Sequence, residues 1–207
     1  MSRSPELALI QKGFTLEVMG EYERAIETLL QAVPLVDREA KPRDWYSLHF
    51  NLAVNLTHVG CFHEAATLLR EVRALAGELK DEINLSRFIW LEGRIAAGLG
   101  LRAEALAILA EAGHQFAARE MFYDVALALL EEAALLLDEG RTAEVKALTP
   151  ELVRVFESKG VHREALAALR LFQEAVEREE ATAELARRVL RYLFRSRYDQ
   201  DLPFTNL

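Results

Sequence analysis

The chain has 207 residues, of which 51% are hydrophobic and 28% charged, and its formal net charge is −8. Because a surface that binds nucleic-acid duplexes carries an excess of Lys and Arg, this charge argues against general nucleic-acid binding. The single cysteine, Cys61, excludes an intramolecular disulfide framework, and no unbroken apolar run of signal-peptide or membrane-spanning length follows the first residues, so we expect a cytoplasmic protein.

Apolar side chains recur at helical spacing along most of the chain, and only five prolines and ten glycines interrupt them. The first helix is expected to begin after Ser4, whose hydroxyl can cap exposed backbone N–H groups, with Pro5 in the first turn. Pro34 is expected either to kink the second helix or to end it early. The pattern predicts helices over residues 5–19, 21–37, 45–59, 62–78, 81–99, 101–113 and 122–139.

Several helix boundaries remain open in the sequence. Asp44 is predicted to cap the helix that begins at Trp45. Residues 113–115 are either an interruption or further helix. Thr149 followed by proline predicts that a new helix begins there. The segment up to residue 159 would then be both the second helix of one hairpin and the first helix of the next. Residues 161–197 contain no glycine or proline and form either one helix or two; a junction near residue 182, where a threonine can cap, is favoured.

A forty-residue repeat runs through this helical pattern. Four glycines stand at that spacing, at the points where the first helix of each pair must stop: Gly20, Gly60, Gly100 and Gly140. Five positions after each glycine stands a small apolar residue: Ala25, Ala65, Ala105 and Val145. A further half-step gives Gly160 and Ala165. A repeat of this length indicates stacked helix hairpins.

These repeated residues resemble those of the tetratricopeptide repeat family, in which small residues of the two helices pack together beside a turn glycine and an aromatic residue. The first-helix small positions here are Gly13, Ala53, Gly93 and Ala133. The turn aromatic is present at Tyr22 and Phe62 but absent at Arg102 and Thr142. The copies also lack the closing proline and are longer than the family's usual length of about 34 residues.

The resemblance covers residues 5–180 and implies an all-α fold. It implies a right-handed α-solenoid of antiparallel helix hairpins, with four to five repeats over residues 1–180. A basic capping helix over 181–198 and a tail over 199–207 complete the expected organisation.

In this family the first helix of each hairpin lines a concave groove. The register implied by the resemblance gives these groove residues: Ile10, Phe14, Phe50, Val54, Trp90, Arg94 and Leu130, flanked by Glu17, Asn51 and Arg87. Such an apolar strip with a basic end differs from the family's carboxylate clamp, so recognition of chaperone tails is not expected. It suits an amphipathic helix or a hydrophobic peptide with an acidic residue. Packing alone explains the same aromatics equally well, and the binding interpretation predicts that Trp90 is partly exposed.

No catalytic, cofactor-binding or metal site is expected. The sequence has no phosphate-binding glycine loop, no H-E-x-x-H pair and no G-x-S-x-G motif. His58, Cys61 and His63 lie near one turn, but their spacing matches neither a zinc site nor an oriented nucleophile. The sequence therefore predicts a protein that is not an enzyme.

The last predicted helix carries five arginines and one glutamate between residues 181 and 198, a net charge of +4 against −12 for the rest of the chain. Such a helix indicates a membrane surface, a nucleic acid or an acidic partner, or else a solvated cap, which is favoured because repeat arrays need a polar outer face. The surrounding stretch also resembles the ends of bacterial repeat proteins that accompany transcriptional regulators.

Two functions follow from these patterns. The first is a non-catalytic scaffold that binds a protein or peptide ligand in its groove, without direct contact to nucleic acid or membrane. The alternative is a sensor or adaptor module of a bacterial transcriptional regulator, acting through homodimerisation or peptide binding.

Overall fold

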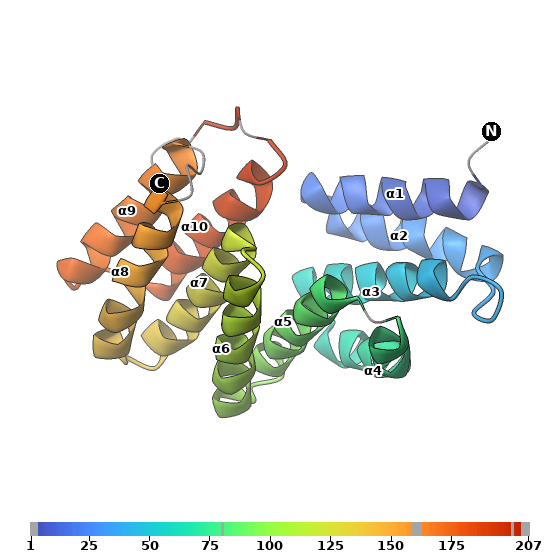
Figure 1. Ribbon diagram of the computed structural model, residues 1–207, viewed down its shortest axis with the longest axis horizontal. Helices are drawn as coiled ribbons and strands as arrows, with labels where there is room; N and C mark the ends of the chain where they lie inside the picture. Colours follow the sequence, from blue (N-terminus) through green and yellow to red (C-terminus); the bar gives the residue numbers. More distant parts are fainter. Residues whose placement is uncertain (1–3, 80, 159–162, 200, 204–207) are drawn as a thin grey trace. The chain divides into compact units, whose positions relative to one another are not determined.

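The computed structural model describes residues 4–79, 81–158, 163–199 and 201–203. All regular structure in these residues is helical, which confirms the predicted all-α class (Figure 1). The helices are α1 (Pro5–Val18), α2 (Tyr22–Ala32), α3 (Pro42–His58), α4 (Phe62–Glu78), α5 (Glu82–Gly98), α6 (Arg102–Ala118), α7 (Phe122–Asp138), α8 (Thr142–Ser158), α9 (Arg163–Glu177) and α10 (Ala183–Ser196). The chain divides into two compact units, Met1–Leu101 and Arg102–Leu207, called here the N-terminal and C-terminal units.

Helix length is constant through the middle of the chain. The six helices from α3 to α8 each contain 17 residues. Each begins twenty residues after the one before it. The forty-residue period of the sequence therefore corresponds to two helices with their two short connections.

Each of the four repeated glycines ends a helix in the left-handed conformation, with φ between 72° and 81°. At Gly60 the glycine N–H donates to the Thr57 carbonyl at 3.3 Å, and the Cys61 N–H donates to the Leu56 carbonyl at 2.9 Å. These two bonds satisfy carbonyl groups that the end of a helix would otherwise leave unpaired. The positive φ explains why glycine stands at these positions.

A non-glycine residue makes the same turn halfway between two of these glycines. Glu120 has φ 56°, and its N–H donates to the Ala117 carbonyl at 3.1 Å. The next N–H, of Met121, donates to the Phe116 carbonyl at 3.0 Å. The turn after α6 therefore repeats the hydrogen bonding of the glycine turns, with the steric cost of a side chain in the left-handed region.

Several predicted boundaries are corrected near the N-terminus. Ser4 precedes α1 but makes no side-chain capping hydrogen bond. Helix α2 ends early, since Pro34 lies in a short 3-10 turn, Val33–Leu35, that follows it. Helix α3 begins at Pro42, because proline fits the first helical turn. Asp44 thus lies inside that turn and is not the cap.

In the second half of the chain, residues 113–115 belong to the uninterrupted α6. The predicted fresh start at Thr149 is wrong, because Pro150 lies inside α8. Burial of Val145 and Val153 on either side of this proline favours a continuous helix despite its missing N–H donor. Gly160, at the half-step of the repeat, lies outside the described residues. Residues 204–207 of the predicted tail also lie outside them.

Helices α9 and α10 are separate, as favoured from the sequence. The junction contains Glu179, which has φ 60°. The Thr182 hydroxyl then accepts a hydrogen bond from the Leu185 N–H at 3.1 Å, capping α10 as predicted.

In the N-terminal unit, α1 packs against α2 and α3 against α4, while α2 also packs against α3 and α4 against α5. The alternate helices α1, α3 and α5 contact one another in that order and form an inner layer. Small residues allow this close packing: a Cβ added to Gly13 would lie 2.6 Å from the Leu29 side chain. Ala25, Ala53 and Ala65 are fully buried.

In the C-terminal unit, each helix from α6 to α9 packs against the next, and α10 packs against both α9 and α7. Helix α7 therefore contacts α6, α8 and α10. Its side chains are buried on most sides, as its apolar sequence predicts: Val125, Leu127, Leu130, Ala133 and Leu136 are almost inaccessible. Helix α10 closes this unit by returning to α7.

Two arginines of α10, and Arg197 directly after its last residue, pair with carboxylates of the same unit. Arg187 pairs with Asp138, and Arg191 pairs with Glu184 at 2.8 Å. Arg197 Nη1 lies 2.7 Å from Asp124 Oδ1, with side-chain exposures of only 20% and 4%. The pairs that Arg187 and Arg197 form with α7 favour the interpretation of α10 as a helix that closes its own unit.

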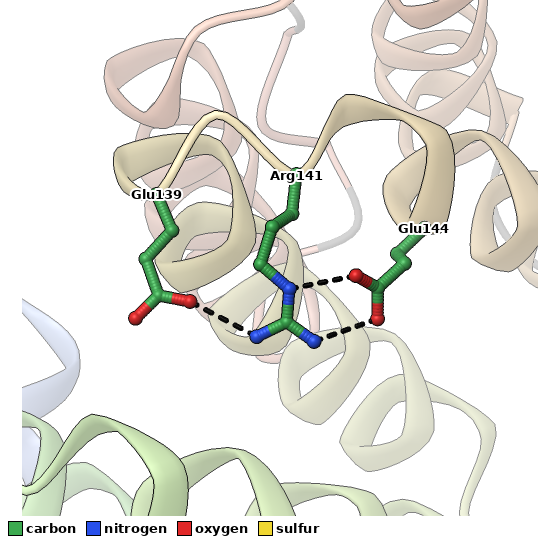
Figure 2. A network of polar contacts seen from close by, with 3 residues as sticks. All are labelled: Glu139, Arg141 and Glu144. Carbon is green, nitrogen blue, oxygen red and sulfur yellow. Dashed lines mark hydrogen bonds and ion pairs between the residues drawn. The ribbon is translucent and has the colours of Figure 1, made fainter.

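The connection between α7 and α8 carries a more exposed ion-pair network (Figure 2). Arg141 bonds Glu139 at 2.9 Å and, through two nitrogens, Glu144 at 2.6 and 2.7 Å. These hydrogen bonds raise the pKa of Arg141 and lower the pKa of Glu144. Solvent screens the network, so it fixes the local turn more than it stabilises the fold.

We predict that, of two substitutions of glycine by alanine in the N-terminal unit, one destabilises the protein and the other stabilises it. In the C-terminal unit, substitution of Glu120 by glycine should also be stabilising. Gly60→Ala should lower the free energy of unfolding by about 1–2 kcal/mol, because alanine resists positive φ. Gly77→Ala should raise it by about 1 kcal/mol, because Gly77 is exposed inside α4 with open space around its Cα. Glu120→Gly should raise it by about 1 kcal/mol. Denaturant unfolding measures all three, and a destabilised Glu120→Gly would contradict the strained turn.

We also predict that Arg197→Ala destabilises the C-terminal unit by about 2–4 kcal/mol, because it removes the guanidinium that is paired with the buried Asp124 carboxylate. Arg141→Ala is the matched control, since it removes an arginine from an exposed network and should leave the unfolding midpoint almost unchanged. Thermal and urea unfolding measure both. Equal effects of the two substitutions would show that the Arg197 pair is not structurally important.

Candidate inner pocket

A pocket of about 520 Å³ opens in the N-terminal unit along its inner layer of helices. Its lining residues come from α1, α3 and α5, and we call it the inner pocket: Ile10, Gln11, Phe14, Thr15, Tyr46, Ser47, Phe50, Asn51, Asn84 and Arg87. This volume lies within the range of about 300–1,000 Å³ that is typical of ligand sites in proteins.

Helical spacing explains how the pocket is built. Residues three or four positions apart share one face of a helix. On α1 the lining residues form two such pairs within residues 10–15, and on α3 they form two more within residues 46–51. Helix α5 adds one pair, Asn84 and Arg87. Because α3 contacts both α1 and α5, these three strips lie next to one another.

Aromatic rings form part of the pocket wall. Tyr46 and Phe50 stack with their ring centroids 5.7 Å apart, and Phe14 is 38% exposed. The Tyr46 hydroxyl donates a weak hydrogen bond to the Asn84 carbonyl at 3.4 Å. Burial, followed by the nearby Asp81 carboxylate, raises the pKa of Tyr46 above its usual range, while Arg87 lowers it. Tyr46 therefore remains a neutral donor at physiological pH.

Arg87 is the one charged residue among the ten that line the pocket. Asp81, whose charge also acts on the Tyr46 hydroxyl, lies at the start of α5. Its carboxylate accepts hydrogen bonds from the Asn84 backbone N–H at 3.1 Å and from the Asn84 side-chain amide at 2.8 Å. The pocket thus presents aromatic, uncharged polar and cationic groups without a carboxylate, histidine or cysteine among its lining residues.

Five of the ten residues predicted to line or flank the groove lie in this pocket: Ile10, Phe14, Phe50, Asn51 and Arg87. Val54 instead lies in the core of the N-terminal unit, 6% exposed. Leu130 lies in the C-terminal unit on α7, where neighbouring helices leave it 1% exposed. These two side chains are packed rather than presented on a surface.

The expectation of a partly exposed Trp90 is wrong. Trp90 retains only 8% of its surface, and the guanidinium of Arg94 lies 5.0 Å from its ring centroid. Arg94 therefore covers the indole by a cation–π contact instead of lining the pocket beside it.

The sequence reasoning also missed half of the pocket: Gln11, Thr15, Tyr46, Ser47 and Asn84. All five residues directly follow an expected position or lie one helical turn from it. A polar residue beside the apolar strip on each inner helix was the signal that could have identified them. The prediction placed only one row of residues from each inner helix in the groove, and the residues on either side of that row were therefore excluded.

A buried polar cluster occupies another part of the same three inner helices. Asn55 donates one hydrogen bond to Glu17 Oε2 at 3.2 Å and another to the Asn51 carbonyl at 2.8 Å. Burial raises the pKa of Glu17 to about 7, although the charge of Arg94 and the Asn55 hydrogen bond lower it. Glu17 thus lies within the packed structure and does not flank an open groove.

His58 is packed beside this cluster. Its ring stacks on that of Tyr22 with the centroids 4.1 Å apart and the planes 1° from parallel. Burial, and secondarily the charge of Arg94, lowers the pKa of His58 to about 2, so the imidazole is neutral at physiological pH. The sequence had placed this histidine near a turn with Cys61 and His63, without a site.

Within the described ranges, no group of three or more His, Cys, Asp or Glu side chains could hold a metal ion. None of the helices in the described part of the chain is long and apolar enough to cross a membrane.

Comparison with known proteins adds no assignment. No protein-family model matches the sequence, and neither curated proteins nor solved structures show significant similarity to it. The function is therefore inferred from the chemistry of the inner pocket.

We predict that the stability of the protein falls between pH 5 and pH 8 because of Glu17. Its pKa of about 7 in the folded state exceeds the ordinary value of 4.5, so the folded state binds this proton more tightly than the unfolded state. The resulting stabilisation is complete below pH 4.5 and is lost as pH rises through 7. Relative to Glu17→Gln, the wild type should lose about 1–3 kcal/mol of unfolding free energy over this range.

Urea unfolding at pH 5 and pH 8 checks this prediction. The control is Glu23→Gln, which removes an exposed carboxylate from α2 and should keep the wild-type pH dependence. If Glu17→Gln also keeps that dependence, the proton is not bound at Glu17.

Proposed function

We propose that the protein is a non-catalytic scaffold that binds a peptide or amphipathic helix of a protein partner in its inner pocket. The observation that carries this proposal is the convergence of Phe14, Phe50 and Arg87 from three different helices on one pocket. Aromatic side chains and arginine contribute much of the binding energy in protein interfaces. Helical repeats commonly bind partners on the surface that their alternate helices form.

We further propose that the helices form a right-handed tetratricopeptide-like stack of hairpins with α10 as its cap. Support comes from the contacts between α1 and α3 and between α3 and α5, because alternate helices of such a stack are neighbours. The burial of small residues at the repeated positions also supports it. The equal length of the six middle helices is a third argument, since equal helices keep each pair in the same register.

A binding role also agrees with the chemistry of the pocket. Among its lining residues, the hydroxyls and amides can orient a ligand, and Arg87 can attract a carboxylate. General acid–base catalysis near neutral pH uses most often a histidine or a carboxylate, which the lining residues do not include. The cytoplasm, where the single cysteine would remain reduced, is the location that we propose for this interaction.

Affinity purification from native cell extract tests the proposal. The bait proteins are the wild type, Phe50→Ala/Arg87→Ala and a control, Leu30→Ala/Arg24→Ala, which removes the same two kinds of side chain from the exposed surface of α2. Circular dichroism first establishes that all three are folded.

We expect a partner that is retained by the wild type and the control and lost by the pocket variant. The purified partner should then bind the pocket variant at least about tenfold more weakly than the wild type, since a central interface residue typically contributes more than about 1.4 kcal/mol. Identical retention by all three proteins would show that the inner pocket is not the binding site.

A further inference from the structure

We infer that Glu17 and Asn55 form a proton-dependent clasp between α1 and α3: protonated Glu17 holds Asn55 by two hydrogen bonds, and loss of the proton weakens this tie. The clasp belongs to the fold of the N-terminal unit and operates whether or not the inner pocket binds a ligand. The deciding feature is the set of hydrogen bonds around the Asn55 side chain.

Asn55 on α3 is fully buried. Its amide nitrogen donates one hydrogen bond to Glu17 Oε2 on α1 at 3.2 Å and another to the Asn51 carbonyl on its own helix at 2.8 Å. Its carbonyl oxygen Oδ1 is also buried, but it has no hydrogen-bond partner among the described residues. A buried acceptor without a hydrogen bond is destabilising, so this oxygen requires a donor beside it.

A protonated Glu17 supplies that donor. A neutral carboxyl group has one O–H donor and one carbonyl acceptor, and an amide has the complementary N–H and C=O groups. The two can therefore be joined in a ring: Glu17 Oε1–H donates to Asn55 Oδ1, while Asn55 Nδ2–H donates to Glu17 Oε2. An ionised Glu17 has only acceptors and leaves Asn55 Oδ1 without a partner.

The surroundings of Glu17 favour the neutral acid. Its side chain lies on the buried side of α1 and is only 5% exposed. Burial raises the pKa of Glu17 to about 7, although the charge of Arg94 on α5 and the Asn55 hydrogen bond lower it. A buried carboxyl that keeps its proton avoids the cost of desolvating a carboxylate. The clasp is thus closed below neutral pH and is lost as the pH rises through 7.

The other titratable groups near this end of α1 lie on α2 and α3. His58 on α3 stays neutral, because burial lowers its pKa to about 2, and its ring stacks on Tyr22 at the start of α2. Glu21, directly before α2, forms a partly exposed ion pair with Arg24. Among these groups, Glu17 is therefore the one whose charge changes near pH 7.

A second polar contact ties the opposite end of α1 to the start of α3. There Glu6 pairs with Lys41, the residue directly before α3. This pairing lowers the pKa of Glu6 and raises the pKa of Lys41, so both side chains remain charged from pH 5 to pH 9. Of the two ties, only the one at Glu17 depends on pH. Loss of its proton should therefore loosen α1 from α3 at the end that carries Glu17.

A double-mutant cycle tests the clasp in the full chain. Urea unfolding at pH 5.5 and pH 8.5 gives the unfolding equilibrium constants of the wild type, Glu17→Leu, Asn55→Leu and the double variant. Leucine has a similar size to both side chains but makes no hydrogen bonds, so the cycle isolates the interaction between them. Glu6→Gln is the control, and its effect relative to the wild type should be the same at both pH values.

We expect the coupling between Glu17 and Asn55 to be at least about tenfold in the unfolding constant at pH 5.5 and below about threefold at pH 8.5. Glu17→Gln should keep the clasp at both pH values, because its amide can form the same two hydrogen bonds. Amide hydrogen exchange in α1, corrected for the intrinsic rate and compared with α4, should rise with pH in the wild type but not in Glu17→Gln.

Carbon-13 NMR of the Glu17 carboxyl in the wild type provides a test that needs no variant. We expect this carboxyl to titrate near pH 7. Titration near the ordinary value of 4.5 would overturn the clasp, because the acid would then be ionised at neutral pH. Coupling that is equal at both pH values, or stronger at pH 8.5, would also overturn it, since Asn55 would then hold the ionised carboxylate. If hydrogen exchange rises with pH in Glu17→Gln as in the wild type, another group loosens α1 and the inference is wrong.

Discussion

The structure depends above all on helix termination at a fixed interval. The left-handed residues at Gly20, Gly60, Gly100, Glu120 and Gly140 end helices with the same two backbone hydrogen bonds. Helices of equal length bury equivalent residues in each copy, such as Ala25, Ala65 and Ala105. Where the left-handed residue is a glutamate, the hydrogen bonds outweigh the steric cost of its side chain.

This regularity gives the inner helices of the N-terminal unit two different regions. In one, residues of α1, α3 and α5 leave an open pocket with aromatic, amide and guanidinium groups. In the other, Glu17 and Asn55 are buried and hydrogen-bonded to each other, with the charge of the half-buried Arg94 nearby. A polar residue on an inner helix thus lines an open pocket in one region and is packed internally in the other, although both have the same helical spacing.

The buried cluster carries an energetic cost that an apolar core would avoid. An ionised carboxylate in a site with little water is disfavoured, which is why the pKa of Glu17 is raised. The hydrogen bond from Asn55 and the charge of Arg94 offset part of that cost. Each of these residues comes from a different inner helix, so the cluster favours one relative arrangement of α1, α3 and α5.

The sequence by itself determined the all-α class, the forty-residue period and most helix boundaries, because these depend on local patterns: apolar spacing, turn glycines and the Thr182 cap. It also indicated five residues of the inner pocket, since residues such as Ile10 and Phe50 stand at equivalent positions of successive repeats. It misplaced Trp90, Arg94 and Leu130, whose surroundings come from other helices. Only the tertiary structure decided which positions of the inner helices are open and which are packed, because burial depends on contacts between segments distant in the chain.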